Sequence, residues 1–131
     1  MTIEQRAEKA AQLKQTSCNC CQAVLCALAD QTGLSEAELL PIGSGFAVGM
    51  GNMEATCGAL VGAVAAAGLA LEGRGTLRYA RQLSEGFRAS CGATLCKELK
   101  GRDTGRMLCS CEDCVRNAVL AYGELVGLKE S

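Results

Sequence analysis

The segment ATCGALVGAVAAAGLAL, residues 55–71, is an uncharged run that lies between two glutamates. It is shorter than the ~20 residues that a membrane-spanning helix needs, and its alanines and glycines are only weakly hydrophobic. The run therefore predicts a buried helix and no membrane span. Within it, Gly58, Gly62 and Ala66 recur at every fourth position, so the backbone of a second helix can approach this face closely.

Apolar residues with a helical period flank this run on both sides, and no stretch alternates like a β-strand. Gly92 predicts a kink, and the glycines of residues 43–51 predict a tight loop mixed with a helical turn. The sequence therefore predicts an all-α fold, a single-domain bundle of five or six helices over residues 1–131 with a glycine-rich central helix. The helices are expected at about residues 3–14, 18–32, 35–40, 55–71, 76–99 and 110–126.

The composition excludes several kinds of chemistry. The chain has 131 residues with ten cysteines and no histidine, so neither histidine catalysis nor histidine-bound zinc is available. Thirteen basic and fourteen acidic residues nearly cancel, which gives no general attraction to nucleic acid or to an anionic membrane. A chain of this length buries a core without disulfide staples, so the cysteines need another explanation.

The cysteine content also bears on the compartment. Residues 1–15 alternate charged and apolar side chains and lack the continuous apolar segment of a secretory signal. We therefore expect a cytoplasmic protein, in a compartment that keeps thiols reduced. Secreted disulfide scaffolds are typically shorter and richer in turn residues, whereas this chain has one proline. Redox or metal chemistry explains the ten thiols better than a disulfide scaffold does.

The cysteines fall into three groups, and several of them lie near the predicted starts of helices. A helix N-terminus offers free amide hydrogens and a partial positive charge, which favour thiolate over thiol. Cys18, Cys57 and Cys111 follow predicted helix starts closely and are candidate thiolates for this reason. The groups are Cys18, Cys20, Cys21 and Cys26; Cys57; and Cys91, Cys96, Cys109, Cys111 and Cys114.

The strongest local motif is CEDC, residues 111–114, because cysteines three apart share a helix face. Such a pair can form one disulfide or hold one metal ion. Cys18 and Cys21 have the same spacing, and two such pairs suggest zinc, although the loop spacing of a zinc ribbon is missing. The number of thiols also permits an iron–sulfur cluster, although no ferredoxin spacing occurs. The disulfide, zinc and cluster interpretations all stay open on these residues.

Packing is the competing explanation for each thiol, because free cysteine is among the most buried residue types. Cys26 and Cys91 lie in apolar stripes and are predicted to belong to the core. Residues 74–106 carry eight basic and three acidic side chains, which either stabilise nearby thiolates or form a solvated helix face. Functional roles are predicted for Cys20, Cys57, Cys96 and Cys111, while Cys18, Cys21, Cys109 and Cys114 are left undecided.

The hexapeptide CGALVG, residues 57–62, matches the CGAxxG signature of the C-GCAxxG-C-C family of redox-active bacterial proteins. The segment NCCQAV, residues 19–24, resembles the first-cysteine segment NCAQAV of that family, with Cys21 where alanine is usual. Residues 44–59, SGFAVGMGNMEATCGA, resemble the family's glycine-rich approach to the signature. The resemblance covers nearly the whole chain.

The later cysteines also resemble this family. Cys96 with the following Glu98 resembles the third-cysteine segment, and either Cys111 or Cys114 before Val115 fits the fourth. The resemblance implies a small helical protein with four functional cysteines and a redox role. The four are Cys20, Cys57, Cys96 and Cys111, with Cys114 as the alternative for the last.

From these cysteines we expect thiol/disulfide exchange or electron transfer, as in a thiol-disulfide oxidoreductase, with a redox partner protein or a small thiol. The first dithiol is Cys57 with Cys20, the second is Cys111 with Cys114 or Cys96, and no cofactor is required. Six further cysteines depart from the family pattern and favour metal chemistry. In that alternative, the metal ligands Cys20, Cys57, Cys96 and Cys111 hold zinc or an iron–sulfur cluster. A third alternative is a helical homodimer in which the thiols mainly pack.

Overall fold

The computed structural model describes residues 1–129 as a bundle of helices, with no β-strand in that part of the chain. The predicted all-α fold is therefore confirmed. The expected number of five or six helices is wrong, because eight α-helices form among the described residues. They are α1 (Ile3–Thr16), α2 (Cys20–Ala27), α3 (Ala29–Thr32), α4 (Glu36–Gly43), α5 (Gly58–Ala70), α6 (Thr76–Cys91), α7 (Cys96–Lys100) and α8 (Cys111–Leu125), with the short helical turns η1 (Ser44–Phe46) and η2 (Gly49–Met53) between α4 and α5.

Two of the predicted helices are each divided by a local break in the backbone. The expected helix 18–32 forms α2 and α3, because Leu28 between them leaves the helical region at φ −109° and ψ 15°. The expected helix 76–99 forms α6 and α7, because Gly92 takes a left-handed φ of +97°. A left-handed residue ends helical hydrogen bonding, and glycine adopts this conformation without a steric penalty. The break at Gly92 is therefore a helix end, and not the predicted kink.

Polar side chains fix the starts of two helices that carry cysteines. Asn19 caps α2, and its side-chain oxygen accepts a hydrogen bond from the backbone N–H of Gln22 at 2.9 Å. The Gln22 side chain accepts one from the Asn19 N–H in return, at 3.0 Å. Ser110 caps α8 by accepting a hydrogen bond from the Asp113 N–H at 3.1 Å. These caps satisfy amide groups that the first turn of a helix leaves unpaired, so they define where each helix begins.

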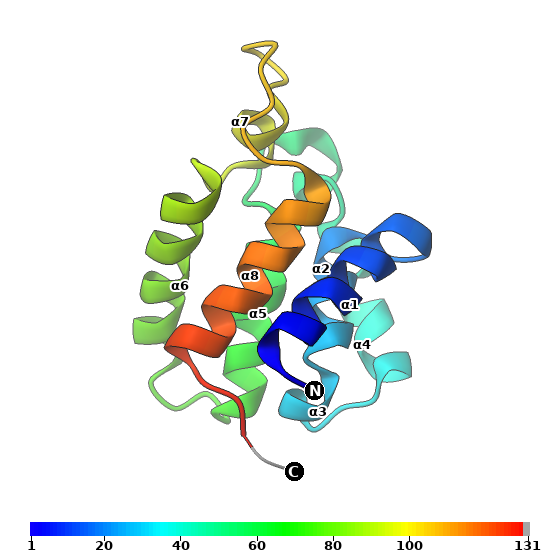
Figure 1. The fold of residues 1–131 in the computed structure, drawn as a ribbon, viewed down its shortest axis with the longest axis vertical. Coiled ribbons are helices and arrows are strands. Elements are labelled where there is room, and N and C mark those ends of the chain that lie inside the picture. The colour runs from blue at the N-terminus through cyan, green and yellow to red at the C-terminus, as the bar shows by residue number, and fades with distance from the viewer. Residues whose placement is uncertain (130–131) are drawn as a thin grey trace.

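The long helices enclose one hydrophobic core. Helix α8 runs across the front of the bundle between α6 and α1, and α5 lies behind it (Figure 1). Helix α2 packs against α5, α1 and α4. Side chains from α1, α2, α5, α6 and α8 all contribute to the core, which makes these helices one packed unit. The largest side chains buried in it are Tyr122, Phe87, Leu25, Leu28, Leu39, Leu83 and Leu99.

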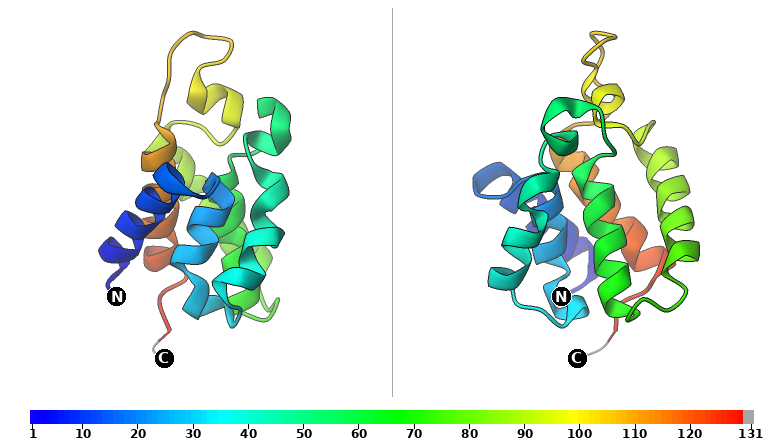
Figure 2. Two further views of the ribbon diagram at one scale, coloured as in Figure 1. Left: turned by 90° about the vertical axis from the view of Figure 1, so that its right-hand side faces the viewer. Right: turned by 180° about the vertical axis from the view of Figure 1, so that it is seen from behind.

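One end of the bundle is built from helix starts and short turns. Turns η1 and η2, helix α7 and the starts of α2, α5 and α8 lie at this end, and the loop of residues 101–110 extends beyond it (Figures 1 and 2). The N-terminus of the chain lies at the opposite end. Most of the cysteines singled out in the sequence are therefore gathered at the end that α7 covers.

Helices α2 and α5 cross closely because α5 presents glycine at the contact. A Cβ atom at Gly62 would lie 2.9 Å from the carbonyl oxygen of Cys21 and 3.1 Å from Cβ of Val24. A Cβ atom at Gly58 would lie 2.8 Å from the carbonyl oxygen of Phe46. Backbone atoms cannot move aside without shifting their helix, so both positions require glycine. The close approach that the sequence predicts at these glycines is confirmed.

The Gly62→Ala substitution is expected to destabilise the fold, whereas Gly68→Ala on the same helix is expected to be neutral or stabilising. The methyl group at residue 62 would overlap the backbone of α2, which costs about 1–3 kcal/mol and outweighs a gain of about 1 kcal/mol in helix propensity. An added Cβ at Gly68 would lie 3.6 Å from Thr76 Cγ2, an ordinary contact. Urea unfolding of both variants measures the difference. Equal changes in stability would contradict the tight crossing at residue 62.

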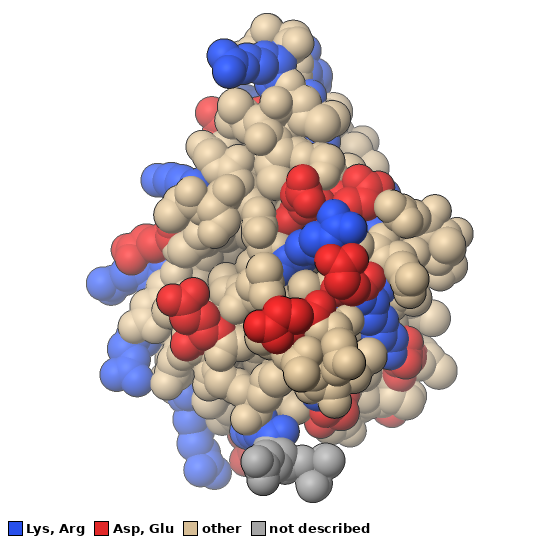
Figure 3. Space-filling model, viewed as in Figure 1, with Lys and Arg blue, Asp and Glu red and all other residues tan. Residues whose placement is uncertain are grey.

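Charged side chains are spread unevenly over the surface. Lys and Arg side chains gather along the edge formed by α6 and at the tip of the loop 101–110 (Figure 3). Arg78, Arg81 and Arg88 on α6 are exposed, so this part of the basic stretch is a solvated helix face. None of the described helices combines the length and the apolar character that crossing a bilayer requires.

Candidate functional site

Cysteines from four segments of the chain line one pocket at the end of the bundle that α7 covers. The pocket has a volume of about 190 Å³. Two lysines share it with the thiols, so the pocket combines nucleophilic sulfur with positive charge. The side chains that can take part in chemistry there are Cys20, Cys57, Cys96, Cys111, Lys14 and Lys100.

Each of these cysteines lies at the start of a helix. Cys20 and Cys111 are the first residues of α2 and α8, and Cys96 is the first residue of α7. Cys57 is the N-cap of α5, which begins three residues later than the expected start at residue 55. The starts of α2, α5 and α8 present free amides and partial positive charge, which favour thiolates at these positions.

Backbone hydrogen bonds hold two of the site positions together. The N–H of Cys57 donates to the carbonyl oxygen of Thr94 at 2.8 Å, and the N–H of Cys96 donates to that of Ala55 at 3.0 Å. These bonds belong to an isolated antiparallel bridge between residues 56 and 95. The bridge therefore ties the start of α5 to the start of α7, although 38 residues of chain separate them.

Three of the pocket sulfurs, those of Cys20, Cys57 and Cys111, are linked through the shifts in their pKa values. Cys20 lies beside Cys111 and Cys57, and hydrogen bonding to these sulfurs, together with burial, raises the pKa of Cys20 far above its ordinary value. The contact with Cys20, opposed by burial and aided by Lys100, lowers the pKa of Cys111 to about 5. Contacts with Cys114 and Cys20 lower the pKa of Cys57 to about 3, although burial opposes this effect. These contacts therefore favour the thiolate form of Cys111 and Cys57 and the thiol form of Cys20.

The ammonium group of Lys100 is buried beside these thiolates. Its Nζ atom has no hydrogen-bond partner at bonding distance among residues 1–129, so its attraction to Cys111 acts as a charge interaction. Burial lowers the pKa of Lys100, but the negative charges of Cys111, Cys114 and Cys20 outweigh burial and raise it above its ordinary value. A buried cation without an oxygen partner is costly, so the thiolates compensate it.

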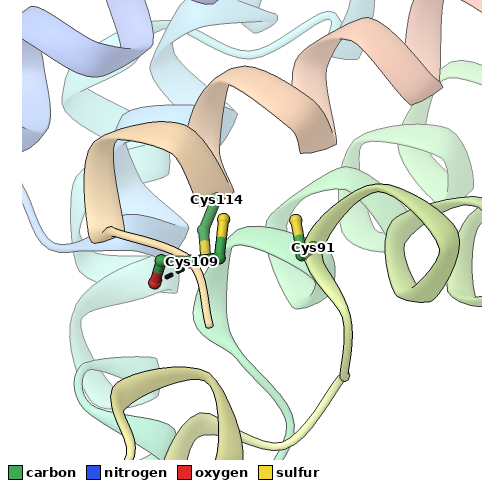
Figure 4. A group of neighbouring side chains, drawn as sticks. All are labelled: Cys91, Cys109 and Cys114. Carbon is green, nitrogen blue, oxygen red and sulfur yellow. Dashed lines mark hydrogen bonds between the residues drawn. The ribbon is translucent and has the colours of Figure 1, made fainter. Parts of the chain in front are cut away.

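A second group of sulfurs lies next to the pocket (Figure 4). The Sγ atoms of Cys91, Cys109 and Cys114 lie within 4.8 Å of one another, a spacing at which they can hold one metal ion. We call these three residues the sulfur triad. Cys91 and Cys114 are buried and Cys109 is partly exposed. The Cys114 sulfur also contacts Cys57, so the triad and the pocket meet at this pair.

Polar contacts orient the sulfur triad. The side-chain amide of Asn117 donates a hydrogen bond to Cys91 Sγ at 3.3 Å, and Cys114 Sγ donates to the carbonyl oxygen of Cys109 at 3.9 Å. Contacts with Cys114 and Asn117 lower the pKa of Cys91 to about 6, although burial opposes this. Burial raises the pKa of Cys109 to about 11. Within the triad, these contacts therefore favour the thiolate form of Cys91 over that of Cys109.

A protein-family model described as "Putative redox-active protein (C_GCAxxG_C_C)" matches residues 18–125. The chain belongs to this family. No curated protein and no solved structure matches the chain. The resemblance that the CGALVG hexapeptide and its neighbouring segments indicate is therefore confirmed for the C-GCAxxG-C-C family.

In this C-GCAxxG-C-C protein, four of the ten cysteines line the pocket, and the other six are not among its lining residues. The structure brings Cys111, and not Cys114, into the pocket with Cys20, Cys57 and Cys96. The two cysteines of the CEDC motif have different neighbours, since Cys111 lies beside Cys20 whereas Cys114 contacts Cys57 and two triad cysteines. All ten cysteines of the described chain are free thiols.

Several features of the site were not predicted from the sequence. Cys26 and Cys91 are buried as expected, but Cys91 also belongs to the sulfur triad. Lys100 was predicted only as part of a basic stretch. Its spacing from Cys96, four residues on the short α7 helix, places both on one helix face and is the signal that could have identified it.

Proposed function

We propose that this protein reduces disulfides by thiol/disulfide exchange, with Cys111 as the attacking thiolate and Cys20 as the resolving thiol. The observation that carries the proposal is the position of Cys111, which is partly exposed in the pocket beside Cys20 and the buried Lys100 ammonium. A cysteine that attacks a disulfide must be accessible and negatively charged, and this position meets both requirements.

The exchange proceeds in two displacement steps. The Cys111 thiolate attacks one sulfur of the substrate disulfide, forms a mixed disulfide and releases the first substrate thiolate, which takes up the proton that Cys20 gives up. The resulting Cys20 thiolate attacks Cys111 Sγ, and the second substrate sulfur leaves as a thiolate that solvent protonates. The protein is left with a Cys20–Cys111 disulfide, and two electrons have passed to the substrate.

Cys57 and Cys96 have different roles in this proposal. Cys57 contacts Cys20, so its thiolate can exchange with the Cys20–Cys111 disulfide. The product is a Cys20–Cys57 disulfide, the pair expected from the sequence, and a regenerated Cys111 thiolate. Burial raises the pKa of Cys96, so this residue stays a thiol. Its role is to contact the substrate, because it lines the pocket. Cys114 also stays a thiol, because its contacts with Cys57 and Cys91 raise its pKa far above the ordinary value.

The pocket and the thiols bear on the substrate and the compartment. A volume of about 190 Å³ accommodates a disulfide group and the atoms next to it, from a small disulfide or from a single cystine of a partner protein, while the rest of the substrate stays outside the pocket. We place the protein in the cytoplasm as a single domain, because ten cysteines stay reduced there until a substrate disulfide arrives.

Oxidation of the reduced protein with oxidised glutathione tests this function. The first protein disulfide is expected to join Cys20 to Cys111 or to Cys57, with two of the ten thiols lost, as peptide mapping by mass spectrometry would record. Cys18→Ser, outside the pocket, is the matched control and should oxidise at the wild-type rate. A protein that keeps all ten thiols, or a first disulfide within the sulfur triad, would rule out the proposed order of exchange.

A second candidate is the binding of zinc or an iron–sulfur cluster by Cys20, Cys57, Cys96 and Cys111. It is supported by the four cysteines that line one pocket of a chain without histidine, because thiolates are ligands of both zinc and iron–sulfur clusters. Protein purified without air should then carry a stoichiometric metal, and a cluster should give it colour. Metal analysis that finds neither zinc nor iron would leave disulfide exchange as the function of the pocket.

A further inference from the structure

The sulfur triad takes no part in the exchange proposed for the pocket. Its cysteines come from three places: Cys91 ends α6, Cys109 precedes the cap of α8, and Cys114 lies in the first turns of α8 (Figure 4). Cys91 and Cys109 lie outside the set that the C-GCAxxG-C-C resemblance implies, and Cys114 enters it only as the alternative to Cys111 for the fourth cysteine. Three thiols that are separate in sequence are nevertheless brought within 4.8 Å of one another.

The spacing of these sulfurs fits a single metal ion. A zinc–thiolate bond is about 2.3 Å long, so thiolates around one ion lie roughly 3.8–4.0 Å apart. Sulfurs that are already within 4.8 Å need only small side-chain rotations to reach this separation. No movement of α6 relative to α8 is required, and these two helices pack directly against each other.

The surroundings of the triad are those of a thiolate site. Asn117 donates to Cys91 Sγ at 3.3 Å, and such outer contacts orient metal ligands and stabilise their charge. The N-terminus of the 15-residue helix α8, capped by Ser110, adds partial positive charge beside Cys109 and Cys114. Asn117 also lines a groove of about 580 Å³ between α6 and α8.

We propose that Cys91, Cys109 and Cys114 bind one thiophilic metal ion with a filled d shell, of the class of Zn(II) and Cu(I). Thiolates select ions of this class, and the chain contains no histidine to change that preference. No other cysteine or carboxylate joins the cluster among the described residues, so three thiolates form the complete protein ligand set. Such a set suits trigonal Cu(I), or Zn(II) with water in the fourth position.

Binding involves no change of oxidation state. Each triad sulfur that still carries a proton releases it to solvent as its sulfur–metal bond forms. The site uses no pocket thiol, so it does not depend on the proposed disulfide exchange. Cys114 contacts Cys57 and is therefore the one point at which the ion would touch the pocket chemistry.

Anaerobic titration of the reduced full chain with Cd(II), a spectroscopic substitute for Zn(II), tests the site. The ultraviolet thiolate-to-metal band reports the number of Cd–S bonds. The titration uses a Cys20→Ser background, in which the pocket lacks one thiol of its set. There we expect one tightly bound ion with three Cd–S bonds. Zn(II) and Cu(I) are then each used to displace Cd(II), and displacement by either one identifies the preferred ion.

Variants in the same background separate the triad from the rest of the protein. Adding Cys109→Ser should weaken Cd(II) binding more than about 100-fold, since loss of outer-shell partners alone costs 10–100-fold. Cys109 is partly exposed, so serine there leaves the core intact. Asn117→Ala should weaken binding about tenfold with three Cd–S bonds retained. Cys26→Ser, a buried cysteine outside the triad, is the matched control and should bind as the background does.

Two results would overturn the proposal. One is unchanged Cd(II) affinity after Cys109→Ser, and the other is loss of the thiolate band in Cys20→Ser alone, which would place the ion in the pocket. Glutathione oxidation reports on the pocket and Cd(II) binding in the Cys20→Ser background reports on the triad, so failure of one function is distinguishable from failure of the other.

Discussion

The Cys111→Ser variant is expected to reduce a small model disulfide more than about a hundredfold more slowly than the wild type, because a serine hydroxyl does not ionise at neutral pH and cannot replace a thiolate nucleophile. The fold should be unaffected, since Cys111 is only partly buried and its helix is capped by Ser110. The rate of thiol release from oxidised glutathione or a chromogenic disulfide measures the effect.

Cys20→Ser should fail at a different step from Cys111→Ser. Attack by Cys111 remains, but no resolving thiol follows, so the mixed disulfide with the substrate should accumulate and be visible as a mass increase. Cys18→Ser, a change of the same kind two residues away, should keep wild-type turnover. Full activity of Cys111→Ser would show that another thiol makes the attack, and the assignment of roles would then be wrong.

Lys100→Met is expected to raise the pKa of Cys111 from about 5 to about 6 or higher, toward the ordinary thiol value of about 8.5. The sign follows from charge, because removing a nearby cation destabilises the thiolate more than the thiol. At a pH below the pKa of Cys111 in both proteins, a rise of about one unit in this pKa lowers the thiolate fraction about tenfold and should slow alkylation about tenfold, since only the thiolate reacts.

The pH dependence of iodoacetamide labelling at Cys111, followed by peptide mass spectrometry, measures this change in pKa. Lys97→Met on the same helix is the control, because the Lys97 ammonium pairs with Glu54 at 3.2 Å and does not line the pocket. Lys97→Met should leave the midpoint of Cys111 in place. An unchanged midpoint in Lys100→Met would mean that the contact with Cys20 alone stabilises the Cys111 thiolate.

Periodicity was sufficient to predict the all-α class, since it records which side chains face a core. It could not predict the number of helices, because the breaks have different origins. Gly92 carries its own signal in the left-handed conformation that glycine favours. Leu28 carries none: it favours helix, yet it is fully buried, and packing decides its backbone conformation.

The candidate site shows the same division between local and tertiary information. The start of α8 was predictable from its Ser110 cap, and with it the position of Cys111. The start of α2 was predicted two residues too early, at residue 18, because Asn19 caps this helix and Ser17 ends α1. The CEDC spacing suggested one site for two cysteines. At a helix start, however, residues one turn apart have different neighbours, and Cys114 belongs to the sulfur triad instead of the pocket.

The burial of Lys100 and the assembly of the sulfur triad were not predicted from the sequence, for a physical reason. A lysine is normally solvated, so the residue type does not predict a buried ammonium, and the four-residue spacing from Cys96 is the one local signal. Cys91 and Cys109 are separated by the whole of α7 and its loop, and only the packing of α6 against α8 joins them.

The antiparallel bridge between residues 56 and 95 holds site positions 57 and 96 by backbone hydrogen bonds alone, which do not depend on the side chains there. Peptide groups hold positions 57 and 96, so a substitution at either one replaces the reactive atom and leaves its location unchanged. Selenocysteine, serine or a non-natural side chain introduced there would meet the same neighbours. This makes the fold a suitable starting point for directed evolution of activities unrelated to sulfur.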